Sequence, residues 1–205
     1  MLDFRYYRKF ITLQNFYIIF ICILLISCSE KISIFQGSDI TGTHIGEGLS
    51  LKDHNGRYCQ LKDFSGKVVI VFFGFTKCPD VCPAALSKLS FALNSLDKNL
   101  AQEVQVLFVS IDSKRDNPKL LKEYVTFFHP NFLGLLGTEE EIQETALLFK
   151  AYYSKIPAQD QVENYNIDHT SMFYLFDRKN QARVLINSNE NTENLIHDIN
   201  ILLKK

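Results

Sequence analysis

Apolar residues beyond position 48 alternate between spacings typical of strands and of helices. Residues 67–73 and 104–111 are continuous runs of β-branched, aromatic and aliphatic side chains, which predicts strands buried on both faces. Residues 84–96 carry leucines at helical spacing, which predicts a helix directly after the first of these strands. The other predicted elements are a hairpin of residues 49–51 and 58–61, helices over 117–128, 142–152 and 191–203, and strands over 132–136, 172–176 and 183–186.

The order of these elements predicts an α/β fold of thioredoxin-like type, with a mixed central sheet flanked by helices. The chain starts β-α-β, continues with helices and a short strand, and closes with a hairpin and a helix. Alternating strands and helices indicate α/β architecture in general. The 205-residue chain is long enough for one such domain, of about 150–160 residues, and an N-terminal appendage.

The N-terminal 28 residues have the pattern of an export segment. A basic start that includes Arg5 and Arg8 precedes an unbroken apolar run over residues 16–26. Eleven apolar residues match the hydrophobic region of a signal peptide and fall short of the roughly 20 that a spanning helix needs. We therefore predict that residues 1–28 are a signal peptide or membrane anchor. The domain is then tethered on the extracytoplasmic (periplasmic) face of the inner membrane.

How the export segment ends is open from the sequence. The tetrapeptide Leu-Ile-Ser-Cys at positions 25–28 resembles the lipobox of bacterial lipoproteins, in which the cysteine is lipidated. Lipidation at Cys28, an uncleaved anchor and simple cleavage are all compatible with this pattern. Residues 29–48 are rich in Ser, Gly and Thr, and we predict a linker there, followed by the domain over 49–205.

Charge and cysteine content narrow the function. The net charge of −1 gives no electrostatic case for a nucleic-acid partner. Of the five cysteines, Cys22 lies within the apolar run, and Cys59 is expected to be a packed strand residue. Cys78 and Cys82 form the one close pair outside the export segment. A single disulfide bridge over so short a loop would not act as a structural framework for the fold. We therefore expect this pair of cysteines to have a chemical function.

The cysteine pair lies where a buried strand ends and a helix begins, which is a common ligand position in α/β sheets. Pro83 fits the first turn of that helix. The positive end of the helix dipole favours thiolate over thiol at Cys78 and Cys82. Thiolates serve both metal binding and disulfide exchange, so the cysteine pair alone does not decide between these two functions.

A histidine about ninety residues later separates these alternatives. Disulfide-exchange proteins of this fold usually place a cis-proline before the corresponding strand, whereas here His169 precedes the strand over 172–176 and the last proline is Pro157. Two thiolates and one imidazole suit Cu(I) and are acceptable for Cu(II). Zinc would accept the same set with a fourth ligand. We expect Asp168 to hold the His169 imidazole through its second nitrogen.

Over most of residues 49–205 the chain resembles the Sco/SenC family of copper-binding cytochrome c oxidase assembly proteins. The segments that carry the resemblance are GFTKCPDVCP at 74–83, VSID at 109–112, RD at 115–116, FHP at 128–130, LLGT at 135–138, YYS at 152–154 and DHT at 168–170. The resemblance implies a thioredoxin fold with a membrane anchor and one copper ion held by Cys78, Cys82 and His169. It also implies a role in supplying or reducing the copper centre of oxidase subunit II. One departure is Ser113, where the family usually has proline.

Two functions follow. The first is a copper metallochaperone, which is not an enzyme and whose partners are cytochrome c oxidase subunit II, copper donors or thiol-redox proteins, and the membrane. The second is a thiol–disulfide oxidoreductase in which Cys78 and Cys82 are redox-active and reduce the cysteines of the oxidase copper site. Loss of His169 should abolish copper binding and largely spare disulfide exchange. A peroxiredoxin is disfavoured because Phe75 stands where its threonine would be.

Overall fold

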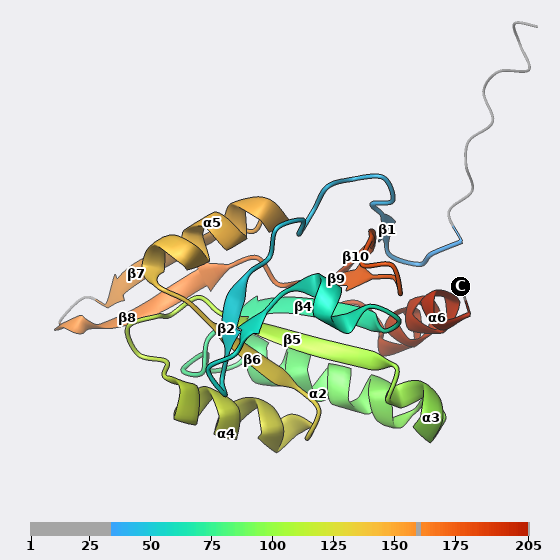
Figure 1. Cartoon of the computed structure of the whole chain (residues 1–205). Coiled ribbons are helices and arrows are strands. Elements are labelled where there is room, and N and C mark those ends of the chain that lie inside the picture. The colour runs from blue at the N-terminus through green and yellow to red at the C-terminus, as the bar shows by residue number, and fades with distance from the viewer. Residues whose placement is uncertain (1–33, 159–160, 205) are drawn as a thin grey trace, which may run out of the picture. The chain divides into compact units, whose positions relative to one another are not determined.

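The two buried runs of the sequence form the centre of an eight-stranded mixed sheet (Figure 1). The computed structural model describes residues 34–158 and 161–204. The central strands β4 (Val68–Gly74) and β5 (Val104–Ser110) are parallel, and every residue of β4 is buried. The strand order is β1 (Ser38–Asp39), β10 (Ala182–Asn187), β9 (Met172–Phe176), β4, β5, β6 (Leu133–Leu136), β2 (Leu51–Asp53) and β3 (Tyr58–Cys59).

Helices cover both faces of this sheet, which confirms the predicted α/β class (Figure 1). Successive strand residues point to opposite faces, so Phe72 and Phe73 enter different layers of the core. Phe73 packs against Phe149 of α5 (Glu139–Phe149), whereas Phe72 packs against Phe108, which in turn contacts Tyr124 of α4 (Pro118–Phe128). The helices are η1 (Leu61–Phe64), α2 (Val81–Asn94), α3 (Lys98–Ala101), α4 (Pro118–Phe128), α5 (Glu139–Phe149) and α6 (Thr192–Leu203).

The helix predicted over 142–152 begins and ends earlier than expected. Thr138 caps α5 by accepting a hydrogen bond from the backbone N–H of Glu141, whose carboxylate accepts one from the Thr138 N–H. The helix ends at Phe149 because Lys150 adopts a left-handed conformation, with φ of 53°. The chain then starts a strand at Tyr153.

The predicted boundary between linker and domain is corrected by the packing of residues 35–48. The described chain from Phe35 onward is one compact unit. Within the predicted linker, Ser38–Asp39 pairs with β10, and both Phe35 and Ile45 are buried in the core. The Ser-, Gly- and Thr-rich composition suggested a linker because single apolar residues that dock onto an unpaired strand edge leave no periodic pattern.

A second sheet of two strands was not predicted. β7 (Tyr153–Ala158) and β8 (Gln161–His169) form an antiparallel hairpin that is separate from the main sheet. Its sequence is polar and contains Pro157, which weakens any strand prediction. His169 is therefore the last residue of a strand, three positions before β9 begins.

The predicted export segment over 1–28, with Cys22 and Cys28, lies outside the described residues. Within the part of the chain that the structure describes, no helix is both long and apolar enough to span a bilayer.

Candidate metal centre

Cys78 and Cys82 lie between the end of β4 and the first turn of α2, as predicted. Both side chains are buried, Cys82 completely. The backbone N–H of Cys82 donates to the Cys78 sulfur over 3.3 Å, so the loop folds back over the helix start. Gly74, the last residue of β4, leaves the space that Cys82 occupies. A Cβ on Gly74 would lie only 2.6 Å from the Cys82 sulfur.

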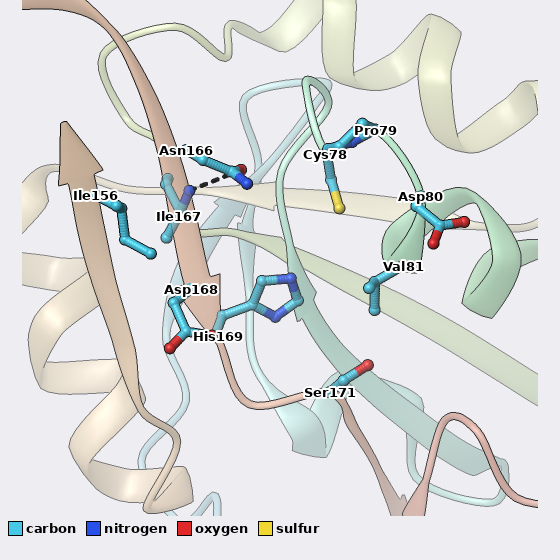
Figure 2. Close-up of a pocket in the computed structure, with 10 residues that line it drawn as sticks. All are labelled: Cys78, Pro79, Asp80, Val81, Ile156, Asn166, Ile167, Asp168, His169 and Ser171. Carbon is cyan, nitrogen blue, oxygen red and sulfur yellow. Dashed lines mark hydrogen bonds between the residues drawn. The ribbon is translucent and has the colours of Figure 1, made fainter. Parts of the chain in front are cut away.

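His169 faces the Cys78 sulfur from the end of β8 (Figure 2). Its Nε2 lies 3.6 Å from the Cys82 sulfur, and the ligand atoms of Cys78, Cys82 and His169 all lie within 4.8 Å of one another. Residues that are remote in sequence thus bring two sulfurs and one nitrogen to a single point. Within the described residues this is the one group of three or more such side chains close enough to share a metal ion.

The tautomer of His169 is set by a backbone carbonyl. Its Nδ1 lies 3.1 Å from the carbonyl oxygen of Thr170, which can only accept a hydrogen bond. Nδ1 therefore carries a proton, and Nε2 is the ring nitrogen that faces the cysteines and can ligate a metal ion. The expectation that Asp168 holds the ring is wrong. Neighbouring strand residues point to opposite faces, and Figure 2 shows the Asp168 carboxylate directed away from the imidazole.

The two thiols have very different acidities. Hydrogen bonding from the Cys82 thiol, followed by that from His169 and from backbone amides, lowers the pKa of Cys78 to about 4, against the opposing effect of burial. The same interaction with Cys78, together with burial, raises the pKa of Cys82. The negative charge therefore resides on Cys78 at neutral pH. Cys59 is a buried strand residue, as predicted, and burial raises its pKa to about 12.

Aromatic rings hold the imidazole from the core side. The rings of Phe72 and Phe75 lie edge-to-face with the His169 ring at centroid distances of 6.3 and 6.0 Å. Both rings are buried, so one side of the imidazole is dry. On its other side, Cys78 and His169 line a cavity of about 250 Å³ between the cysteine loop and the hairpin (Figure 2).

A buried carboxylate fixes the start of the cysteine loop. Asp116 accepts hydrogen bonds from the Thr76 hydroxyl at 2.5 Å and the Thr76 backbone N–H at 3.1 Å, and from the Ser110 hydroxyl at 2.5 Å. Asp112 and Arg115 also form an ion pair with each other. Sequence analysis gave neither carboxylate a role in the site, although both follow β5 at the edge where the cysteine loop leaves β4.

This donor set fits copper. Thiolates are soft ligands that select Cu(I), and imidazole completes a three-coordinate site. A structural zinc site needs four ligands, and the cluster of described residues supplies three.

The family model SCO1/SenC matches residues 38–204. The chain belongs to the SCO1/SenC family. A SCO2-like protein of Rickettsia felis is 39% identical over 133 residues, which is 65% of this chain and 64% of that protein. The chain thus matches a little less than two thirds of that relative's length.

Solved structures of Sco proteins share the fold. The structure of Bradyrhizobium japonicum ScoI with copper bound is 35% identical, covers 77% of this chain and 99% of its own, and has a TM-score of 0.69. A disulfide switch is described in BsSco, a member of the Sco family of cytochrome c oxidase assembly proteins. It is 25% identical, covers 82% of this chain and 97% of its own, and has a TM-score of 0.62. These matches confirm the thioredoxin-like fold and the family resemblance seen in the sequence.

Proposed function

We propose that this chain is a copper metallochaperone that holds one Cu(I) ion through Cys78, Cys82 and His169. The observation that carries the proposal is the convergence of three suitable ligand atoms within 4.8 Å. Cys78 is already a thiolate at neutral pH because of its lowered pKa, so it provides the first ligand without losing a proton. Binding to Cys82 as well displaces the proton that this thiol carries.

Release of copper begins on the cavity side of the site. Cys78 and His169 line the cavity, whereas Cys82 lies beneath them and is fully buried. An incoming thiolate or imidazole from a partner replaces His169 and then Cys78 while Cys82 still holds the ion. Such stepwise exchange keeps copper bound throughout the transfer.

The recipient that we propose is the dinuclear copper site of cytochrome c oxidase subunit II. Support comes from the family, since a relative of known structure is described as an oxidase assembly protein. The basic and apolar start of the sequence supports export and tethering through residues 1–28 to the periplasmic face of the inner membrane. Lipidation at Cys28 and an uncleaved anchor would each provide this tether, whereas simple cleavage would release the domain.

A specific observation also favours the alternative function, a thiol–disulfide oxidoreductase. Cys78 is a stabilised thiolate next to a second thiol at a helix start, which is the arrangement of redox-active dithiols. As a reductant, Cys78 attacks a disulfide of the recipient to form a mixed disulfide. Cys82 then attacks Cys78, which leaves a Cys78–Cys82 disulfide and two reduced thiols on the recipient.

Transfer and reduction are distinguished with the full-length chain and a recombinant copper domain of oxidase subunit II. We expect the copper-loaded chain to transfer Cu(I) to the reduced domain, and His169→Ala, which binds copper poorly, to transfer little. The same variant should still reduce an oxidised domain if the second function holds. Failure of the wild-type chain to transfer copper, with intact reduction of the domain, would replace the first function by the second.

A further inference from the structure

The hairpin that carries His169 has little intrinsic stability. β7 and β8 form their own two-stranded sheet, and Figure 1 shows this hairpin extending beyond the main sheet. A two-stranded hairpin alone is marginally stable in water at best. The position of His169 relative to the cysteines is therefore set by the contacts that fasten the hairpin to the rest of the domain.

One buried carboxylate makes the main polar contact of this kind. Asp112, which follows β5, is fully buried. The hydroxyl of Tyr165 on β8 donates to its Oδ1 over 2.5 Å, and the Arg115 Nε pairs with its Oδ2. A hydrogen bond to a buried, charged acceptor is stronger than one between neutral groups. We call Asp112, Arg115 and Tyr165 the hairpin latch.

Arg115 holds Tyr165 in two further ways. Its Nη1 donates to the backbone carbonyl of Tyr165 over 2.7 Å. Its guanidinium group lies 3.7 Å from the centre of the Tyr165 ring, which is a close cation–π contact. The latch therefore fixes both the side chain and the backbone of β8 at this residue.

The latch also contacts the cysteine side of the site. The Arg115 guanidinium lies 5.7 Å from the centre of the Phe75 ring, and Phe75 packs against His169 in an edge-to-face arrangement. Tyr165, Ile167 and His169 alternate along β8 onto one face, and Ile167 between them is buried. Tyr165 and His169 are four residues apart, so the latch is about 13 Å along the strand from the ligand.

We propose that the hairpin latch positions His169 for copper and so determines how tightly the site holds Cu(II) relative to Cu(I). This inference rests on the proposed copper function. The two thiolates make the larger contribution to Cu(I) binding, so that complex tolerates a displaced imidazole, whereas Cu(II) depends more on a well-placed imidazole nitrogen. Loosening the hairpin therefore weakens the Cu(II) complex while the Cu(I) complex changes little.

Two variants test the latch. Tyr165→Phe removes only the hydroxyl that binds Asp112, and Arg115→Lys keeps the charge but not the forked contacts to Asp112 and Tyr165. Glu139→Gln is the matched control, because Glu139 of α5 pairs with Lys155 on the same hairpin at 2.6 Å but is half exposed. Exposed ion pairs of this kind contribute little.

The readouts are affinity, spectrum and backbone opening in the full-length chain. We expect both latch variants to lose about tenfold in Cu(II) affinity, in the range seen when the support of a metal-ligating histidine is removed. Cu(I) affinity should stay within about threefold, since thiolates dominate it. The nitrogen hyperfine coupling of bound Cu(II) should weaken or become heterogeneous. In the copper-free protein, amide hydrogen exchange in β8 should be faster in the latch variants than in wild type or Glu139→Gln.

Each outcome decides one question. If the wild-type chain binds no copper, the proposed function fails and this inference fails with it. If the wild type binds copper, but the latch variants match Glu139→Gln in Cu(II) affinity, spectrum and amide exchange, the latch inference alone is overturned. A urea denaturation curve for each variant separates loss of the site from loss of the fold.

Discussion

Cys78 and Cys82 carry different charges although they lie four positions apart in one short segment. Cys78 accepts hydrogen bonds from Cys82 and from His169, which stabilises its thiolate. Cys82 is buried beside that negative charge, and its pKa rises. The pair therefore combines an anionic sulfur that borders the cavity with a protonated sulfur below it. This arrangement suits an ion or a disulfide that arrives from the cavity.

The acidity of Cys78 predicts reactivity at low pH. In the reduced, copper-free chain, alkylation of Cys78 by iodoacetamide should stay near its neutral rate down to about pH 5, because its pKa is about 4. Cys82→Ala removes the largest stabilising hydrogen bond, so the alkylation profile should shift to higher pH. Peptide mapping by mass spectrometry follows Cys78 separately from the other cysteines.

The shape of this pH profile is the critical quantity, since burial slows the absolute rate. His169→Ala serves as the comparison, with a smaller shift than Cys82→Ala because its hydrogen bond contributes less. A wild-type profile centred near pH 8.5, the value of a free cysteine, would contradict the assigned charge state.

At the scale of elements, the last residue of β4 leaves room for one of the cysteine ligands. A Cβ on Gly74 would lie 2.6 Å from the Cys82 sulfur and 2.8 Å from Phe108. Gly74→Ala should therefore displace Cys82 and lower Cu(I) affinity by about tenfold or more, because metal sites tolerate little misplacement. The stability cost of such overpacking is about 1–3 kcal/mol.

A second glycine gives the matched control for this prediction. A Cβ on Gly134 of β6 would lie 2.4 Å from Leu121 of α4, which is a comparable clash that involves neither the cysteines nor His169. Gly134→Ala should lose a similar amount of stability in urea and keep its Cu(I) affinity. Equal losses of affinity in both variants would mean that copper binding reports only general stability.

The elements with strong periodicity could be predicted from the sequence, and those without it could not. The continuous apolar runs gave β4 and β5, and Pro118 after Asn117 marked the start of α4. The β7–β8 hairpin was missed because most of its sequence is polar, Pro157 lies within it, and its position depends on tertiary contacts. The same holds for β1, which forms only against the edge of β10.

The features of the site also divide into those that the sequence could predict and those that it could not. All three candidate ligands were predicted and lie together, since cysteine and histidine spacing on this fold is informative. The support of His169 was assigned to Asp168 and is provided by the Thr170 carbonyl, because a backbone acceptor has no sequence signature. The hairpin latch likewise could not be predicted from the sequence, since it joins residues about fifty positions apart.

At the scale of the whole molecule, the domain keeps two segments distant in sequence in fixed relation. The cysteine loop leaves the rigid centre of the sheet, and His169 arrives on a hairpin that is fastened at its side. The rigid part supplies the two thiolate ligands, and the fastened part supplies the imidazole ligand that leaves first. A protein that must bind copper and later release it benefits from this division.

The most direct measurement is the copper content of the full-length chain after anaerobic loading with Cu(I) under reducing conditions. Wild type, Cys78→Ala, Cys82→Ala and His169→Ala are compared after removal of weakly bound metal by a competing chelator. We predict about one copper ion in wild type, because the chain offers one thiolate–imidazole cluster of this type among its described residues, and little in each variant. Wild-type chain that retains no copper, while its cysteine pair still exchanges with dithiols, would contradict the metallochaperone account.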